Sequence, residues 1–265
     1  MRTPFLATMT VAAAALLGSS AAYAGPLGIN LPNNFYFDTT KSYETLVTNT
    51  SPTLSGVFEV GTISSSQNGP NTYVYGQGGK FLMGSFSGFT LASQQTNGSV
   101  SILNFTGAGS IKYWVQNSDL FTITSGQPAD FAAVATGGPA NLWLSATAQP
   151  LDANGTTLQI TLNQYTSLAQ FGSSSAFAQL DVTGGAAAPF LKSQAFTGFG
   201  GNHFDLAFQG GANVDSPTNP CGPDFGVCGS NFVKGIVVPE PLTLSLFGVG
   251  LVGAAGIGRR KARKD

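Results

Sequence analysis

The sequence predicts an all-β fold, an antiparallel β-sandwich or a jelly-roll-like body, between an N-terminal signal helix and a single C-terminal transmembrane helix. Short segments with alternating apolar and polar residues recur along the chain, and turn-forming residues separate them at short intervals. Only 9% of the residues are charged, which is typical of exported β-rich proteins. Hydrophobic residues make up 42%, enough for a folded core and too many for a wholly disordered chain.

The clearest predicted strand is residues 157–163. Its Leu158, Ile160 and Leu162 alternate with Thr, Gln and Asn, so we expect the apolar side chains to face the core and the polar ones to face water. Other segments of similar length and composition extend along the body, which points to a sandwich or jelly roll. The predicted strands are residues 55–60, 72–75, 80–83, 99–105, 111–115, 141–146, 157–163 and 204–208.

Glycine-rich segments separate several of these strands. We expect residues 76–79 and 107–109 to close two hairpins, because glycine adopts the backbone conformations that tight turns require. Residues 152–155, Asp-Ala-Asn-Gly, have the composition of a turn. No segment has a convincing amphipathic helical pattern, although residues 129–135 or 165–171 could hold a short helix. The body, residues 25–235, therefore reads as one exported β-rich domain.

The charge balance of the body argues against a nucleic-acid partner. Between residues 25 and 238 there are five lysines, no arginine and ten carboxylates, a net charge of about −5. Nucleic-acid binding requires clustered Lys and Arg to neutralise phosphates. The sequence also contains no motif that implies a cofactor.

Residues 1–24 have the three parts of a secretory signal peptide. Arg2 supplies the positive charge, residues 5–18 form an apolar stretch, and Ala22 and Ala24 give the small-x-small cleavage pattern before Gly25. Signal peptidase and the Sec export machinery are the partners this implies. We expect cleavage after Ala24; the alternative is an uncleaved anchor.

The C-terminal segment, residues 236–265, has three parts in a fixed order. Val238-Pro239-Glu240-Pro241 comes first, and its prolines favour a rigid extended conformation. Residues 242–258 carry no charge and as a helix would be roughly 25 Å long, which spans a bilayer core only marginally. The tail, residues 259–265, is strongly basic and is expected to stay cytoplasmic as a stop-transfer signal. Its basic residues are Arg259, Arg260, Lys261, Arg263 and Lys264.

This order resembles the PEP-CTERM sorting signal over about the last 28 residues. The resemblance rests on Pro239-Glu240-Pro241, the apolar helix at 242–258 and the basic cluster that follows. It implies recognition by an exosortase, cleavage near the motif, and release or transfer to the cell envelope or extracellular matrix of a Gram-negative bacterium that makes exopolysaccharide. A retained membrane anchor is the alternative.

The remaining candidate sites are weaker. Cys221 and Cys228 predict a disulfide that closes a short loop, with free or metal-linked thiols as the alternative. We expect no metal site, because His203 is the single histidine and no second cysteine pair exists. Asp152 and Asn154 could offer oxygens to calcium, but a plain turn is the simpler interpretation.

Catalytic residues are not indicated. A catalytic triad would have to use His203, and no nucleophile elbow precedes a helix. A pair of carboxylates could hydrolyse glycosides, but any chain with this many carboxylates offers some pair. The candidates are Glu44, Glu59, Asp119, Asp130, Asp181 and Asp205.

The sequence therefore favours a non-enzymatic structural or interaction protein. The alternative is a module that binds exopolysaccharide, with Trp114 and Trp143 as stacking residues and amide side chains that read hydroxyl groups. Both tryptophans could instead fill the core. An envelope hydrolase is the least favoured possibility.

Overall fold

The computed structural model describes residues 22–23, 27–47, 52–66, 69–121, 141–167, 171–214 and 227–236. Nearly all of them belong to one compact unit, Tyr23–Val238. This part of the chain is mainly β-strand, which confirms the all-β prediction; its α-helix, α3 (Ala188–Leu191), is a single turn. No helix among the described residues is long and apolar enough to cross a membrane. The predicted signal sequence up to residue 21 and the predicted span 242–258 lie outside these residues.

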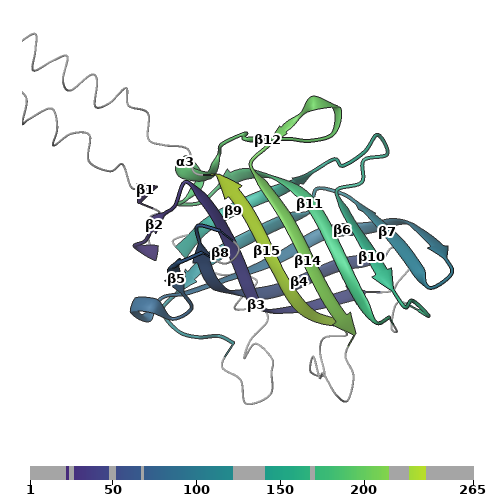
Figure 1. Ribbon diagram of the computed structural model, residues 1–265, viewed down its shortest axis with the longest axis horizontal. Helices are drawn as coiled ribbons and strands as arrows, with labels where there is room; N and C mark the ends of the chain where they lie inside the picture. Colours follow the sequence, from purple (N-terminus) through teal and green to yellow (C-terminus); the bar gives the residue numbers. More distant parts are fainter. Residues whose placement is uncertain are drawn as a thin grey trace, which may run out of the picture. The chain divides into compact units, whose positions relative to one another are not determined.

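The long strands form one sheet of eleven strands, and each pairs with its neighbours in antiparallel orientation (Figure 1). The strands are β3 (Asn34–Val47), β4 (Thr53–Ser64), β5 (Asn71–Val74), β6 (Phe81–Asn97), β7 (Val100–Thr106), β8 (Ser110–Gln116), β9 (Leu142–Gln149), β10 (Leu158–Asn163), β11 (Ser173–Gly184), β14 (Leu206–Val214) and β15 (Val227–Ile236).

The two predicted hairpins are wrong, because the strands on either side of each glycine-rich segment do not pair with each other. β5 and β6 both pair with β4, and β7 and β8 both pair with β6. β5 and β6 are therefore two parts of one strand that is interrupted at residues 75–80. β7 and β8 are likewise two parts of one strand that is interrupted at residues 107–109. Gly76 and Gly78, with φ of 79° and 62°, turn the chain out and back. β9 and β10 repeat this arrangement along β11, with residues 150–157 as the excursion.

When each interrupted strand is counted as one strand, the topology is a meander whose last strand pairs with its first. Each strand pairs with the next in sequence, from β3 and β4 through β5–β6, β7–β8 and β9–β10 to β11, β14 and β15, and β15 then pairs with β3. The sandwich or jelly roll predicted from sequence requires two facing sheets, whereas the long strands form one continuous sheet and the remaining described strands form two separate two-stranded sheets. The opposite walls of the continuous sheet enclose a core, as the two sheets of a sandwich would. Sequential pairing is the simplest outcome when connections are short.

An aromatic cluster fills the interior between the walls. The ring centroid of Phe37 on β3 lies 5.3 Å from that of Trp143 on β9 and 5.7 Å from that of Tyr113 on β8. Phe58 on β4 packs against the same tyrosine at 5.1 Å. β3 is not a neighbour of β8 or β9 in the sheet, so these contacts cross the interior. Burial raises the pKa of Tyr113 above its ordinary value.

Two glycines make room for rings from the neighbouring strand. Phe58 on β4 lies opposite Gly84 on β6, and Phe86 on β6 lies opposite Gly56 on β4. A Cβ atom on Gly84 would meet the Phe58 ring and lie 2.5 Å from the carbonyl oxygen of Lys112. A Cβ atom on Gly56 would lie 2.5 Å from Cζ of Phe86. Each of the two strands thus places an aromatic ring over a glycine of the other strand.

Tyr73 closes the excursion between β5 and β6. Its hydroxyl donates to the carbonyl of Lys80 at 3.1 Å and accepts from the amide of Leu82 at 2.9 Å. Burial raises the pKa of Tyr73 to about 12. The neutral phenol thus joins the two ends of the excursion, and its ionisation would remove the donor.

We expect Gly84→Ala to destabilise the full chain by roughly 2–3 kcal/mol, because the new methyl group meets both a ring and a backbone carbonyl. Gly184→Ala is the matched control, since a Cβ atom there meets only Ser145 Oγ, at 3.1 Å. Urea unfolding followed by tryptophan fluorescence measures both. Equal stabilities for the two variants would contradict the reciprocal packing.

Tyr73 also predicts a dependence of stability on alkaline pH. Because its pKa is higher in the folded chain, its contribution is complete below pH 10 and is lost as pH rises through about 12. Urea unfolding between pH 9 and pH 12 should therefore show a falling free energy of unfolding, with a shallower fall in Tyr73→Phe. The same slope in both proteins would rule out this contribution.

Candidate functional site

Most of the sorting and processing residues predicted from sequence lie outside the described part of the chain. Ala22 is described, in the two-residue strand β1 (Ala22–Tyr23), which pairs with β2 (Asn30–Leu31). Cleavage after Ala24 would remove β1. The backbone of Cys228 pairs with that of Asn213, but Cys221 is not described, so the disulfide stays a prediction. The other residues outside the described part are Ala24, Gly25, Val238, Pro239, Glu240, Pro241, Arg259, Arg260, Lys261, Arg263 and Lys264.

The two tryptophans proposed to stack on sugars are both buried. Trp143 is 0% exposed and belongs to the interior aromatic cluster. Trp114 is 4% exposed; it pairs with Met83 on the outer face of the sheet, where Met83 packs with Tyr43, Val57 and Phe121. Neither ring presents a face to solvent. The proposal of stacking on Trp114 and Trp143 is therefore incorrect, and packing explains both residues.

Two of the candidate carboxylates lie close together, joined through one glutamine. Gln194 Nε2 donates to Asp205 Oδ1 at 3.2 Å and to Asp181 Oδ1 at 3.3 Å. Burial raises the pKa of Asp181, and the nearby charge of Asp205 raises it further. The sequence offered several possible carboxylate pairs and did not indicate that Asp181 and Asp205 would lie close together.

The geometry gives Asp205 a structural role. It is fully buried, and its two carboxylate oxygens accept from the amide of Val182 at 2.8 Å and from the amide of Gln194 at 2.6 Å. It thereby ties the segment after α3 to β11. His203 lies two residues away on β13 (His203–Phe204), which pairs with β12 (Phe196–Thr197), and its side chain is exposed. A buried carboxylate that serves two backbone amides is poorly placed for acid–base chemistry on a substrate.

Other candidate acidic residues also have structural partners. Asp119 accepts from the hydroxyl of Tyr75 at 2.6 Å and from the amide of Phe121 at 2.8 Å. Burial, together with this hydrogen bond, raises the pKa of Tyr75. Asp152 accepts from the amides of Asn154 and Thr156 and from the Thr156 hydroxyl, which lowers its pKa and makes residues 152–156 a turn. In the described part of the chain, no three acidic, histidine or cysteine side chains gather as a metal site would require.

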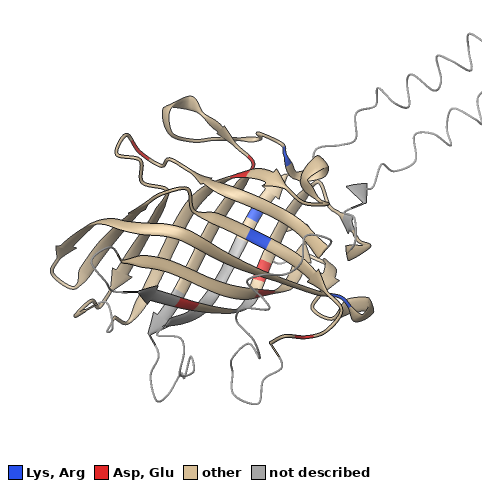
Figure 2. Cartoon of the chain, turned by 180° about the vertical axis from the view of Figure 1, so that it is seen from behind, with Lys and Arg blue, Asp and Glu red and all other residues tan. Residues whose placement is uncertain are grey.

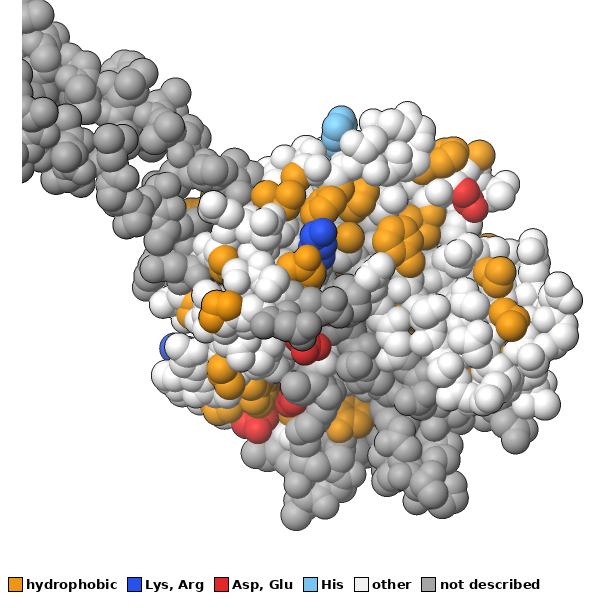
Figure 3. All heavy atoms as spheres, viewed as in Figure 1, with side chains coloured by type: hydrophobic (Ala, Val, Ile, Leu, Met, Phe, Trp, Pro, Cys, Tyr) orange, Lys and Arg blue, Asp and Glu red, His pale blue; other side chains and the backbone are white. Residues whose placement is uncertain are grey.

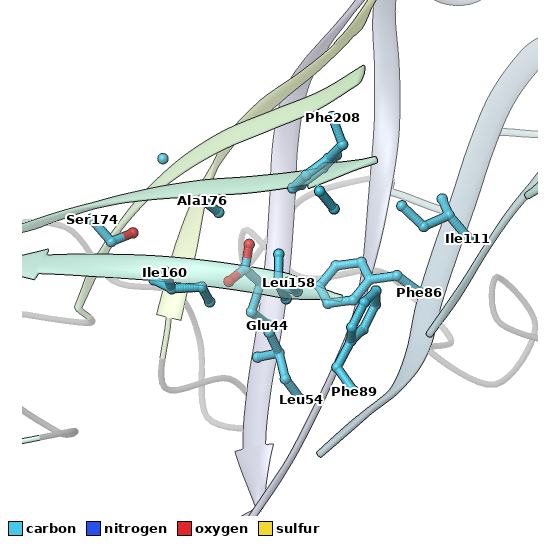
Figure 4. A pocket seen from close by; sticks show the side chains of 12 residues that line it. Glu44, Leu54, Phe86, Phe89, Ile111, Leu158, Ile160, Ser174, Ala176 and Phe208 are labelled. Atoms are coloured by element: carbon cyan, nitrogen blue, oxygen red, sulfur yellow. The ribbon is translucent and has the colours of Figure 1, made fainter. Parts of the chain in front are cut away.

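A small cavity remains inside the closed sheet, and Glu44 points into it (Figure 4). The lining is otherwise mainly apolar and includes Phe86, Phe89, Leu158 and Ile160. Ser42 Oγ donates to Glu44 Oε1 at 3.2 Å. The cavity volume is about 30 Å³, which has room for about two water molecules. A substrate-sized molecule does not fit unless the rings move.

The outer face of the sheet has a larger hollow, of about 460 Å³. Gln159 on β10, Phe177 on β11 and Gln209 on β14 line it and lie directly opposite one another on adjacent strands. Both glutamines are exposed and the ring is half-buried. Gln159 alternates with the buried Leu158 and Ile160, so this row faces away from the core. We call the three residues the amide–aromatic row.

Hydrogen bonds extend the row over two further strands. Gln159 Nε2 donates to Asn104 Oδ1 on β7 at 3.0 Å, and Asn104 Nδ2 donates to Ser93 Oγ on β6 at 3.1 Å. Side chains from five adjacent strands therefore form a line across the strand direction. With strands ~4.8 Å apart, the line is roughly 19 Å long.

The strands that carry this line are almost free of charge. β6, β7, β10 and β14 contain no charged residue, and β11 contains Asp181 near its end. The charged residues of the domain are correspondingly sparse on the long strands (Figure 2). Figure 3 views the side on which β11 and β14 lie and shows a surface mainly of uncharged polar side chains and backbone, with scattered hydrophobic groups. Such a surface can exchange hydrogen bonds with a neutral polar ligand.

The amide–aromatic row could not be recognised from sequence patterns alone. Its members lie far apart in the chain, and only the register of β10, β11 and β14 brings them together. The available signal was the alternation in residues 157–163, which places Gln159 on the outer face. Nothing in the sequence identifies Phe177 or Gln209 as its neighbours.

Comparison with known protein families, curated proteins and solved structures found no significant match to this chain.

We expect Asp205→Asn to lower the free energy of unfolding by about 3 kcal/mol, because the new amide group faces a backbone N–H that it cannot accept from. Asp181→Asn, at a half-buried site beside the same glutamine, is the control and should change it by less than about 1 kcal/mol. Urea unfolding of the full chain compares the two. A larger loss in Asp181→Asn would contradict the assigned structural role.

Proposed function

We propose that the chain is an exported protein of the cell envelope or extracellular matrix, sorted at its C-terminus by an exosortase. The observation that carries this proposal is the order of Pro239-Glu240-Pro241, the apolar residues 242–258 and the basic residues 259–264, with a signal peptide at the other end. The signal peptide would deliver the body across the inner membrane by Sec export, and signal peptidase would cleave it after Ala24. The C-terminal helix would hold the chain transiently, with its basic end in the cytoplasm.

The role of the body is, in this proposal, structural or binding and not enzymatic. The hydrogen bonds of Asp205, Asp119 and Asp152 support it, because each carboxylate is engaged in holding the fold. The interior cavity is too small for a substrate. An envelope hydrolase is less well supported for the same reasons.

A carbohydrate-binding module is the second candidate. The amide–aromatic row favours it, because amide groups both donate to and accept from hydroxyl groups, and a half-buried ring offers an apolar face. In this proposal the sugar contacts are on the outer face of the sheet, away from Trp114 and Trp143. Host exopolysaccharide is then the candidate partner of the body.

The sorting proposal predicts the mass of the protein recovered from its native host. We expect a species that begins at Gly25 and ends near residues 238–241, found in the envelope or medium. Deletion of the exosortase should shift the C-terminus to Asp265 and retain the protein in the membrane. Asp265→Asn is a matched control that should be processed normally, whereas Glu240→Ala should impair processing. A wild-type mass that retains residues 259–265 would replace sorting with a plain membrane anchor.

A further inference from the structure

We infer that the outer face of β10, β11 and β14 binds a neutral polysaccharide chain, with the Phe177 ring as its platform and the amides of Gln159 and Gln209 beside it. The inference rests on the matrix or envelope location proposed above only for the source of the ligand.

The arrangement of donors and acceptors suits a sugar. Gln159 and Gln209 are exposed and flank Phe177 in register on the neighbouring strands. Each amide offers both a carbonyl oxygen and an NH₂ group, so it can pair with a hydroxyl group in either direction. The half-buried ring provides an apolar surface between them, and the hollow of about 460 Å³ provides the space.

The absence of charge selects the class of polysaccharide. The five strands that carry the row and its hydrogen-bonded extension contribute one charged residue, Asp181, which lies near the end of β11 and outside the hollow. An acidic polysaccharide would need Lys or Arg to offset its carboxylates, and the three strands that line the hollow contain none. On the neighbouring β15, Lys234 lies opposite Ala207, and its ammonium group lies over the rings of Tyr36 and Phe196, 5.8 Å from each centroid. A neutral chain requires no compensating charge.

The length of the line favours a polymer over a single sugar. Gln159 is hydrogen-bonded to Asn104, and Asn104 to Ser93, so the side chains beyond the hollow are already held in place. Such preorganisation reduces the conformational entropy lost on binding. A linear chain laid across the strands could contact successive side chains of this line.

Affinity gel electrophoresis tests the inference with the full chain, purified in a detergent that has no sugar headgroup. The probes are hydroxyethylcellulose, dextran and galactomannan as neutral polysaccharides, and alginate as an acidic one. We expect at least one neutral polysaccharide to retard the protein, and alginate to have little effect. Phe177→Ala and Gln209→Ala should each weaken the retardation at least tenfold. Phe199→Ala, which removes a ring that is 43% exposed elsewhere on the domain, is the matched control and should behave like wild type.

Three results would overturn the inference: no retardation by any neutral probe, equal retardation of Phe177→Ala and wild type, or retardation by alginate as strong as by the neutral probes. Circular dichroism of each variant checks that the fold is retained, so that weaker retardation can be attributed to the lost side chain. Because sorting is read from the mass of the protein in its host, failure of polysaccharide binding would leave the sorting proposal intact, and a retained anchor would leave the binding result intact.

Discussion

The packing of aromatic rings over glycines on neighbouring strands is the constraint on which the closed sheet depends. Phe58 covers Gly84, Phe86 covers Gly56, and at the closing pair of strands Phe35 covers Gly235. A narrow interior cannot hold a large side chain from every strand, so a ring from one strand occupies the space that its neighbour leaves empty. Because proteins pack their interiors densely, the position of each ring fixes the register of two strands at once.

This filling of the interior determines where a ligand can be bound. The cavity that remains, beside Glu44, has a volume of about 30 Å³, because rings such as Trp143, Tyr113 and Phe37 fill the rest of the interior. Any ligand recognition by the described strands would therefore use the outer face, where side chains can vary without disturbing the core. The row of Gln159, Phe177 and Gln209 lies there, and its spacing is set by the same strand register that the interior rings impose.

Local patterns in the sequence predicted individual strands well and their pairing poorly. Leu158, Ile160 and Leu162 are buried, and Gln159 and Asn163 are exposed, as the alternation indicated. The glycine-rich residues 76–79 do turn the chain, but a turn that ends a strand and one that interrupts it have the same local sequence. The turn ends a strand if the next segment pairs with the preceding one, and it interrupts a strand if the next segment continues along β4. Contacts between residues that are distant in sequence decide between these two outcomes. The burial of Trp114 and Trp143 is equally a property of the assembled sheet.

Closure of the sheet also bears on how a protein with so few charges avoids pairing with its own copies. Four of the five strands that carry the polar line contain no charged residue, so charge gives little repulsion between copies at this face. Exposed strand edges would then invite pairing between chains, because their backbone donors and acceptors are unsatisfied. In this sheet the pairing of β15 with β3 joins the first long strand to the last, so the backbone groups of both are engaged within one chain. The closed sheet thus limits pairing between copies where charge does not, and the outer face can remain uncharged, as the proposed binding of a neutral polysaccharide requires.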